Sequence, residues 1–374
     1  MYNYLQDVRE YWGHKVLLQG GVAMASTKTL VKRWLVYPLV LLVLLFLCMV
    51  KEVLVELASF VLPRRTNAVV RTPDHRFGDV GRLGYAFEPN YVDLPIGGGV
   101  CLPRVHYIDE GPRDAKETIL CLHGEPSWSF LYRKMVPGLL KAGYRVIAPD
   151  FIGFGKSDKY TDMEQYTHEM HKMTLRLLLN HLKVGDVTLV CQDWGGLVGL
   201  SVVREMPHIF SRLVIMNTGL PDGTIDLGLS FLPFLMWRSF ARLFGTLLPV
   251  YDIFGKAFLN PDQAVLEAYA APFPSREYKA GAAQWPLLVP IHPYNPVSCD
   301  MQATREFLAA NWKERPALIM FSDRDPITRG QEKMFLKLLP HASTKTVVGA
   351  QHFLQEDKGE ELTTHIISFI EGKL

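Results

Sequence analysis

The sequence predicts an α/β protein in which helices cover both faces of a mostly parallel, doubly wound sheet. Three observations support this fold class. Strand-like and helix-like segments alternate through the body of the chain, and several strand segments are continuous apolar runs, as expected of strands buried on both faces. The stretches 135–142 and 168–182 are long enough for crossover helices. The predicted strands are Arg104–Ile108, Thr118–Leu122, Arg145–Pro149, Val187–Gln192, Arg212–Met216, Ala317–Phe321 and Thr344–Val348.

Length and composition limit the classes of function. The chain has 374 residues, of which 48% are hydrophobic, so it can bury a large core. Its net charge is +2 and its basic residues are interspersed with acids, which argues against a nucleic-acid partner. The five cysteines are not closely paired, and no Cys-x-x-Cys or His-x-x-x-His spacing suggests a metal site. We therefore expect a function that needs neither a metal nor another cofactor.

The first 66 residues form an extension with an apolar segment. Residues 34–50 carry no charge and are at the short end of what spans a bilayer as a helix. A cleaved signal peptide is the alternative, but the run is long for one and Leu57-Ala58-Ser59 is a poor cleavage site. We expect an uncleaved single-pass anchor, with residues 53–62 as an interfacial extension. Slightly more Lys and Arg precede the segment than follow it, which favours a non-cytoplasmic body.

One interval interrupts the alternation of strands and helices. Residues 220–311 contain no convincing core strand and read as helical sequence punctuated by aromatic residues and prolines. An insertion of this size between strands of the sheet predicts a helical cap over an active site. The expected order is therefore the extension 1–66, a first core part 67–219, the cap, and a second core part 312–374.

The strand 187–192 ends in Asp193-Trp-Gly-Gly, and a helix is predicted over Leu197–Val203. A strand, a sharp turn and a helix make a nucleophile elbow, in which small residues lie two before and two after the nucleophile. Cys191 and Gly195 take those positions, so Asp193 takes the position of the nucleophile. A carboxylate attacks carbon directly and leaves an ester on the enzyme. On this motif alone, an Asp that only caps the helix is an equally good interpretation.

A second motif, Leu122-His-Gly-Glu-Pro-Ser-Trp, opens a loop after a predicted strand. In α/β-hydrolases a backbone N–H of this loop, together with that of the residue after the nucleophile, forms the oxyanion hole. The predicted donors are the main chains of Glu125 and Trp194. We assign no proton transfer to the Glu125 carboxylate, which can be a structural group hydrogen-bonded near the turn. His123 is interpreted as structural.

Two segments near the C-terminus supply an acid and a base. Asp325 directly precedes Pro-Ile and is preferred as the acid to Asp323, which can cap the turn. His352 follows the last predicted strand in a loop that suits a base. With Asp193 first, the order nucleophile, acid, histidine is that of an α/β-hydrolase triad.

From about residue 67 to its end the chain resembles the haloalkane dehalogenases whose oxyanion loop reads His-Gly-Glu-Pro. The resemblance implies that Asp193 displaces halide from a small apolar organohalide, and that His352, oriented by Asp325, activates water to hydrolyse the ester. It also implies two indole N–H donors for the halide, because Trp is a donor only. Trp194 matches one, and Trp237 matches the second better than Trp285 does. The matching stretches are 71–74, 123–133, 148–158, 192–196, 268–274 and 352–356.

Two other functions stay open at this point. Epoxide hydrolases resemble this chain in fold and in their Asp nucleophile, but they need acidic hydroxyls from the cap. Tyr251, Tyr269 and Tyr278 are available for that role. The third hypothesis is a membrane-tethered binding protein that has lost catalysis. It is weakened by the presence of every triad residue.

Overall fold

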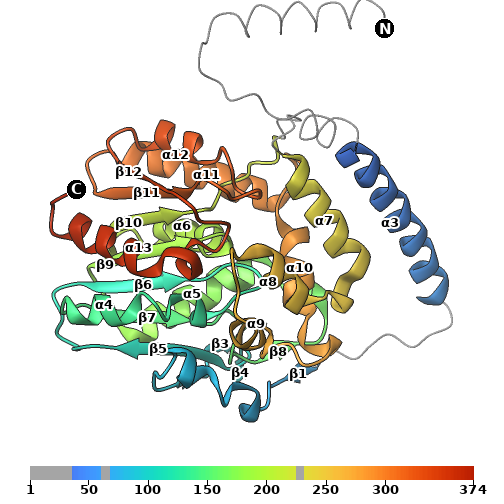
Figure 1. The fold of residues 1–374 in the computed structure, drawn as a ribbon, viewed down its shortest axis with the longest axis horizontal. Coiled ribbons are helices and arrows are strands. Elements are labelled where there is room, and N and C mark those ends of the chain that lie inside the picture. Colours follow the sequence, from blue (N-terminus) through green and yellow to red (C-terminus); the bar gives the residue numbers. More distant parts are fainter. Residues whose placement is uncertain (1–35, 60–67, 225–230) are drawn as a thin grey trace, which may run out of the picture.

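The computed structural model describes residues 36–59, 68–224 and 231–374. An eight-stranded sheet forms the centre of this part of the chain, in the order β12-β11-β10-β9-β6-β7-β5-β2 (Figure 1). The pairings from β12 to β7 are parallel, whereas β5 pairs antiparallel with both β7 and β2. The strands are β2 Asn90–Val92, β5 Val105–Glu110, β6 Thr118–Leu122, β7 Arg145–Pro149, β9 Val187–Gln192, β10 Phe210–Met216, β11 Ala317–Ser322 and β12 Ser343–Val347.

This architecture confirms the predicted fold class. The bounds of β6, β7 and β9 are those predicted, since each is an apolar run whose residues are all buried. The short edge strand β2 was not predicted. Nor were two small two-stranded sheets, which pair β1 (Val69–Val70) with β8 (Lys159–Tyr160) and β3 (Pro95–Gly97) with β4 (Val100–Cys101).

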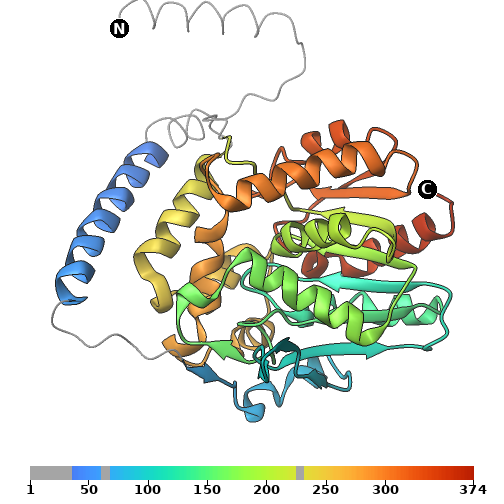
Figure 2. The ribbon, with the colours of Figure 1, turned by 180° about the vertical axis from the view of Figure 1, so that it is seen from behind.

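Helices cover the sheet in two layers. The helices α4 and α13 pack against each other on one face (Figure 1). The opposite face carries α5, α6 and α11, which pack in that order (Figure 2). The helix α12 packs on β11 and α11. The bounds are α4 Val136–Lys141, α5 His168–Leu182, α6 Trp194–Glu205, α11 Pro296–Asn311, α12 Glu332–Leu338 and α13 Leu354–Ile370.

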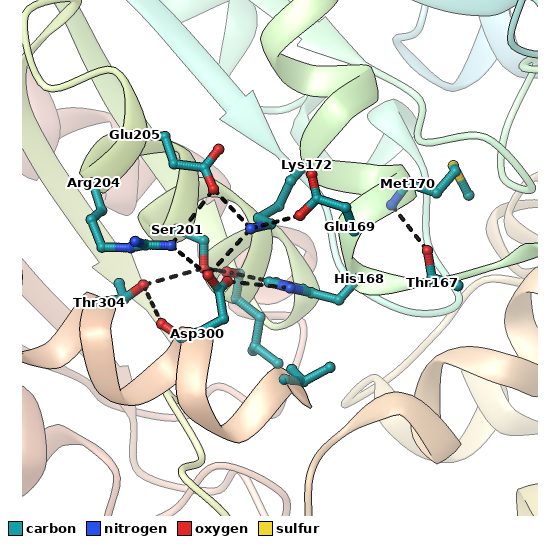
Figure 3. Close-up of polar contacts among 12 residues, drawn as sticks. Thr167, His168, Glu169, Met170, Lys172, Ser201, Arg204, Glu205, Asp300 and Thr304 are labelled. Atoms are coloured by element: carbon teal, nitrogen blue, oxygen red, sulfur yellow. Dashed lines mark hydrogen bonds and ion pairs between the residues drawn. The ribbon is translucent and has the colours of Figure 1, made fainter. Parts of the chain in front are cut away.

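A network of charged side chains joins α5, α6 and α11 (Figure 3). Asp300 of α11 lies 3.2 Å from the Lys172 ammonium of α5 and also pairs with Arg204 of α6. Lys172 bonds Glu205 of α6 at 2.8 Å, and the Lys172 side chain is only 6% exposed. His168 completes the network, with its Nδ1 3.4 Å from Asp300. The three helices behind the sheet are therefore tied together by ion pairs as well as by apolar contacts.

The described residues between β10 and α11 form a cap with four α-helices. It comprises α7 Leu232–Phe244, α8 Val250–Ala257, α9 Gln263–Ala270 and α10 Ala280–Leu288. As predicted, the described part of 220–311 contains no strand. The cap was predicted to end at residue 311, but we propose an earlier end because α11 packs on α6 and α12 of the core. We therefore end the cap before Pro296. A helix that closes an insertion and one that re-enters the core have the same local pattern.

Among the described residues, the helix α3 (Tyr37–Ser59) precedes the strands of the body and runs beside α7 (Figures 1 and 2). Within the described residues, only its segment Tyr37–Val55 is long and apolar enough to cross a membrane, with a mean hydropathy of 2.5. That criterion is one of length and composition, which a signal sequence also meets. The predicted anchor at 34–50 and its extension at 53–62 fall on α3, apart from residues 34, 35 and 60–62, which lie outside the described residues.

Candidate active site

The turn between β9 and α6 is made by Asp193. Its φ of 51° and ψ of −124° are sterically unfavourable for a residue with a side chain, and such strain is typical of functional sites. The helix begins at Trp194, so the predicted start at Leu197 is wrong by three residues. The sequence suggested that the glycines form the turn. In the structure the turn consists of Asp193 alone, and Gly195 and Gly196 already belong to the first turn of the helix.

These glycines and the oxyanion loop permit close packing around Asp193. A Cβ on Gly195 would lie 2.1 Å from the carbonyl oxygen of Leu122, and one on Gly196 would lie 2.1 Å from the Thr218 hydroxyl. A Cβ on Gly124 would lie 2.4 Å from the Cβ of Asp193. A side chain at Gly124 would therefore displace the Asp193 carboxylate, and side chains at Gly195 and Gly196 would clash with the Leu122 backbone and with Thr218.

The structure brings the three predicted triad residues together. Asp193 Oδ2 lies 3.5 Å from His352 Nε2, and His352 Nδ1 lies 3.0 Å from Asp325 Oδ2. Asp325 also accepts hydrogen bonds from the N–H of Ile327 at 2.8 Å and from the Thr328 hydroxyl. Asp323 lies elsewhere and accepts the N–H of Gly349 at 2.8 Å, which is the turn role considered for it.

Two carboxylates determine the charge of His352. Burial alone would lower its pKa, but the charge of Asp325 and hydrogen bonds to Asp193 and Asp325 outweigh burial and raise the pKa to about 10. Burial opposes ionisation of Asp325 too, and the His352 charge overcomes it and holds the pKa of Asp325 below its usual range. In the free protein His352 is therefore an imidazolium between two carboxylates at neutral pH.

The oxyanion loop places its backbone donor on the nucleophile. The Glu125 N–H donates to Asp193 Oδ1 at 2.8 Å. Trp194 is the first residue of α6, so its N–H has no acceptor within the helix. His123 is structural, as interpreted: it is fully buried, and its Nε2 accepts the N–H of Phe151 at 3.0 Å.

The Glu125 carboxyl differs from expectation. We expected a hydrogen bond near the turn, but its Oε1 is buried and has no hydrogen-bond partner within the described residues. Glu125 is one of the residues that line the cavity above Asp193. Burial and the charge of Asp193 raise the pKa of Glu125 well above its usual range, which favours the neutral form of this carboxyl.

Three further side chains hold the triad, and the sequence analysis did not identify them. Gln192 Nε2 lies 3.1 Å from His352 Nε2 and 3.2 Å from the His352 carbonyl oxygen. Asn217 Nδ2 donates to the same carbonyl at 3.0 Å, and the Thr218 hydroxyl donates to the Asp193 carbonyl at 2.7 Å. All three lie at the carboxyl ends of β9 and β10, which is the available sequence signal for them.

A cavity of about 190 Å³ opens above Asp193 and is lined mainly by apolar side chains of the core and the cap. Trp194 and Trp237 both face it, from α6 and α7. Trp285 is fully buried outside its lining. The Trp285 indole stacks on Trp194 at 5.1 Å and donates its N–H to His171. The other lining residues are Glu125, Pro126, Phe234, Ile253, Lys256, Ala257, Pro286, Val289, Pro326, Ile327, Gln351, His352 and Phe353. Among the described residues no cluster of His, Cys, Asp or Glu suits a metal ion.

The parallel sheet, the strained Asp193, the His352–Asp325 pair and the cap define a capped hydrolase with a carboxylate at the nucleophile position. In agreement, a sequence profile described as alpha/beta hydrolase fold matches residues 117–359. The haloalkane dehalogenase of Psychrobacter cryohalolentis is 42% identical over 309 residues, which cover 81% of this chain and 98% of that protein. Haloalkane dehalogenase 1 of Mycobacterium tuberculosis is 43% identical over 305 residues, covering 80% and 98%.

A solved structure has the same fold. The tetrameric haloalkane dehalogenase DpaA from Paraglaciecola agarilytica NO2 gives a TM-score of 0.73 at 34% identity, with 80% of this chain and 97% of that chain covered. The chain belongs to the haloalkane dehalogenase family of the α/β-hydrolases.

Proposed function

We propose that this protein hydrolyses the carbon–halogen bond of small apolar haloalkanes, with Asp193 as nucleophile, His352 as base and Asp325 as the acid that orients it. The observation that carries the proposal is the small apolar cavity, in which one aspartate faces two tryptophan side chains. An apolar cavity accepts an alkyl chain, and the carboxylate is the anion that attacks it.

In the first step Asp193 attacks the carbon that bears the halogen. A C–O bond forms, the carbon–halogen bond breaks with its electron pair going to the halide, and an alkyl ester of Asp193 remains. The departing halide carries a full negative charge in apolar surroundings, so it needs N–H donors. We assign this role to the indoles of Trp194 and Trp237, which both face the cavity. Trp285 is excluded from the assignment because its N–H is donated to His171.

The second step depends on a change in the charge around His352. Ester formation removes the charge of Asp193, which is one of the groups that raise the His352 pKa. The pKa therefore falls once the ester exists, the imidazolium releases its proton to solvent, and the neutral imidazole can take a proton from the attacking water. Water adds to the ester carbonyl carbon, while the N–H groups of Glu125 and Trp194 stabilise the oxyanion. Collapse breaks the bond between that carbon and the alkoxy oxygen, which releases the alcohol and restores Asp193.

The epoxide hydrolase alternative is disfavoured by the positions of the candidate tyrosines. Tyr269 is fully buried and donates its hydroxyl to Glu356 at 2.7 Å. Tyr251 is 39% exposed on the outer surface of α8. Neither these two nor Tyr278 is among the described residues that line the cavity. Ring opening of an epoxide would thus lack the two acidic hydroxyls that it requires.

The binding-protein alternative predicts that the nucleophile is dispensable. The alignment of Asp193, His352 and Asp325 and the N–H donated by Glu125 support catalysis over this alternative. We also propose that α3 attaches the chain to a membrane, whether it crosses the bilayer, as predicted from the sequence, or lies in its plane. Its hydropathy and its exposed side chains support this attachment.

The test is halide release, measured by ion chromatography, from short bromo- and chloroalkanes incubated with the full-length chain. We expect release by the wild type and none by Asp193→Ala. Asp323→Ala is the matched control and should keep its activity, because this acid only caps a turn. Turnover of styrene oxide without halide release would establish the epoxide hydrolase instead. If the folded protein turned over neither the haloalkanes nor styrene oxide, the result would favour the non-catalytic binding protein.

A further inference from the structure

A narrow seam on α3 is shielded from solvent. Cys48 is 4% exposed, and Leu41, Leu44 and Lys51 are half-buried. These residues follow one another at spacings of three and four, which places them on a single stripe of a helix. Apart from Tyr37 and Pro38, the other described side chains of α3 are exposed, and only 6% of its apolar window is buried.

The seam packs on the cap helix α7 in a fixed register. Cys48 Sγ lies 3.4 Å from the carbonyl oxygen of Ser239, and the Lys51 ammonium donates to the Arg242 carbonyl at 2.6 Å. Both pairs are 191 residues apart in sequence, so the two helices run parallel. Arg242 also pairs with Glu52 at 3.0 Å. Two polar contacts and an ion pair thus hold α3 along the cap (Figures 1 and 2).

The side of α3 opposite the seam is a continuous apolar ridge. Its members again recur at spacings of three and four, and none of them is polar. Each is more than half exposed: Leu39 63%, Leu42 63%, Phe46 59%, Met49 57% and Val53 53%. A ridge of this length is too large an apolar surface to remain in water.

The flanks between seam and ridge show what covers α3. Val43 and Leu45 are each 50% exposed, and Leu47 is 42% exposed. A partner helix, including α3 of a second copy, would cover one stripe and leave the other two sides in water. A fluid apolar medium covers all three sides at once. The composition of α3 therefore fits the acyl region of a lipid bilayer.

The packing on α7 also constrains how α3 lies in that bilayer. A helix of 23 residues is roughly 34 Å long, enough to cross the hydrocarbon. If α3 crossed while packed on α7, then α7 would enter the hydrocarbon as well. The helix α7 carries Arg238 and Arg242, and its inner side chains Phe234 and Trp237 line the active-site cavity. A cap around an aqueous reaction cannot be immersed in this way.

We propose that α3 lies in the plane of a membrane, with its ridge in the acyl region and its seam on α7, so that the cap is held at the bilayer surface. The cap continues this surface beyond the seam, since Phe244, Leu247 and Tyr251 are 38%, 65% and 39% exposed. Resting on the function proposed above, the substrates are lipophilic haloalkanes that reach the cavity from the lipid.

The seam is tested in the full chain, reconstituted into phosphatidylcholine vesicles. In a Cys101→Ser/Cys299→Ser background, Ser239→Cys should form a disulfide with the native Cys48 under mild oxidation, identified by non-reducing peptide mapping. The matched control is Ala241→Cys, which is also on α7 but fully buried on another face, and it should not cross-link. If the Ser239→Cys protein formed no cross-link, the proposed packing of the seam on α7 would be overturned.

The ridge and the in-plane geometry are tested separately. Wild type should float with the vesicles in a density gradient, and Leu42→Glu/Phe46→Glu should lose flotation. When vesicles that carry the protein with a tag at each chain end are treated with protease, both tags should be digested or both should be protected. Tags on opposite sides of the membrane would show that α3 spans it and would overturn the proposal. Failure to float, with a dimer by light scattering, would assign the ridge to a second copy and overturn it too.

The source of substrate is tested by comparing two substrates in vesicles. Leu42→Glu/Phe46→Glu should match wild type on a short, water-soluble bromoalkane and fall at least tenfold in kcat/KM on a long-chain bromoalkane. Equal activity on both substrates would overturn delivery from the lipid. Lack of halide release in every sample, with flotation intact, would overturn the proposed function and leave the membrane geometry in place.

Discussion

At the scale of single residues, the proposed mechanism depends on the charge of Asp193, which is one of the groups that raise the pKa of His352. His352 lies between Asp193 and Asp325, at 3.5 Å and 3.0 Å, and its pKa is raised to about 10. In the proposed reaction His352 acts as a base only in the second step. Its imidazolium form must therefore lose a proton after the first step. Esterification of Asp193 meets this requirement without any movement of the chain, because it deletes one of the two charges.

The substitution Asp193→Asn imitates the charge of the ester. We expect it to lower the pKa of His352 below about 10, as measured by NMR titration of nitrogen-15 histidine. The wild-type pKa exceeds the usual value of 6.5, so this interaction stabilises the fold fully below pH 6.5 and is lost as pH rises towards 10. Urea denaturation should thus show a larger difference between the two proteins at pH 6 than at pH 10. Identical His352 titrations in both proteins would contradict the proposed coupling.

Removing the base should stop the reaction halfway. In His352→Ala the nucleophile remains, so we expect a burst of one halide per enzyme and then no turnover, because no base activates the water. Intact-protein mass spectrometry should detect the added alkyl group, and peptide mapping should place it on Asp193. His341→Ala, which removes an exposed histidine that contacts the Arg315 carbonyl, is the control and should turn over normally.

At the scale of elements, two cap helices supply tryptophans with different partners. Trp237 of α7 faces the cavity, and Trp285 of α10 bonds His171. We expect Trp237→Phe to weaken halide binding roughly 10- to 150-fold, the cost of one hydrogen bond to a charged group. Trp285→Phe should instead lower the free energy of unfolding by about 1–3 kcal/mol, because His171 loses its donor. Calorimetric titration with bromide and urea denaturation separate these effects. Halide binding lost with Trp285→Phe alone would reverse the assignment.

How well each helix or strand could be predicted depends on whether its own residues or residues distant in the sequence determine its structure. The strands β6, β7 and β9 were predicted to the residue because strands buried on both faces consist mainly of apolar residues. The edge strand β2 has three residues with mixed exposure and carries no such pattern. The start of α6 was misplaced because glycine usually marks a turn, whereas here it is required for close packing.

The residues of the candidate site also differ in whether a local sequence pattern predicts them. The sequence could place Asp193, Asp325 and His352 because each follows a recognisable strand. The choice between Trp237 and Trp285 depends on how cap helices pack, which no local pattern encodes. The contacts of Gln192 and Asn217 with His352 join segments more than 100 residues apart, so only the folded chain shows them.

At the scale of the whole molecule, the network in Figure 3 fixes the helices behind the nucleophile. We expect Asp300→Ala to lower the free energy of unfolding by about 1.5–3 kcal/mol, since Arg204 and the largely buried Lys172 each lose one charged partner while Lys172 keeps Glu205. Chemical denaturation checks this value. The control is Asp79→Ala, whose pair with Arg82 is more than 80% exposed on both sides and should change stability by less than about 0.5 kcal/mol. Equal effects would mean that the network contributes no more than a surface pair.

The register of α3 on α7 also has a consequence for biosynthesis. Ser239 follows Cys48 by 191 residues, so a ribosome that adds roughly 5–20 residues per second completes α3 roughly 10–40 s before its docking site exists. During that interval the nascent apolar helix has no docking site on α7. Aggregation or capture by a chaperone then competes with its association with a membrane. Targeting of the ribosome to a membrane would resolve this competition. The catalytic body would then be made, and would fold, beside a helix that is already in lipid.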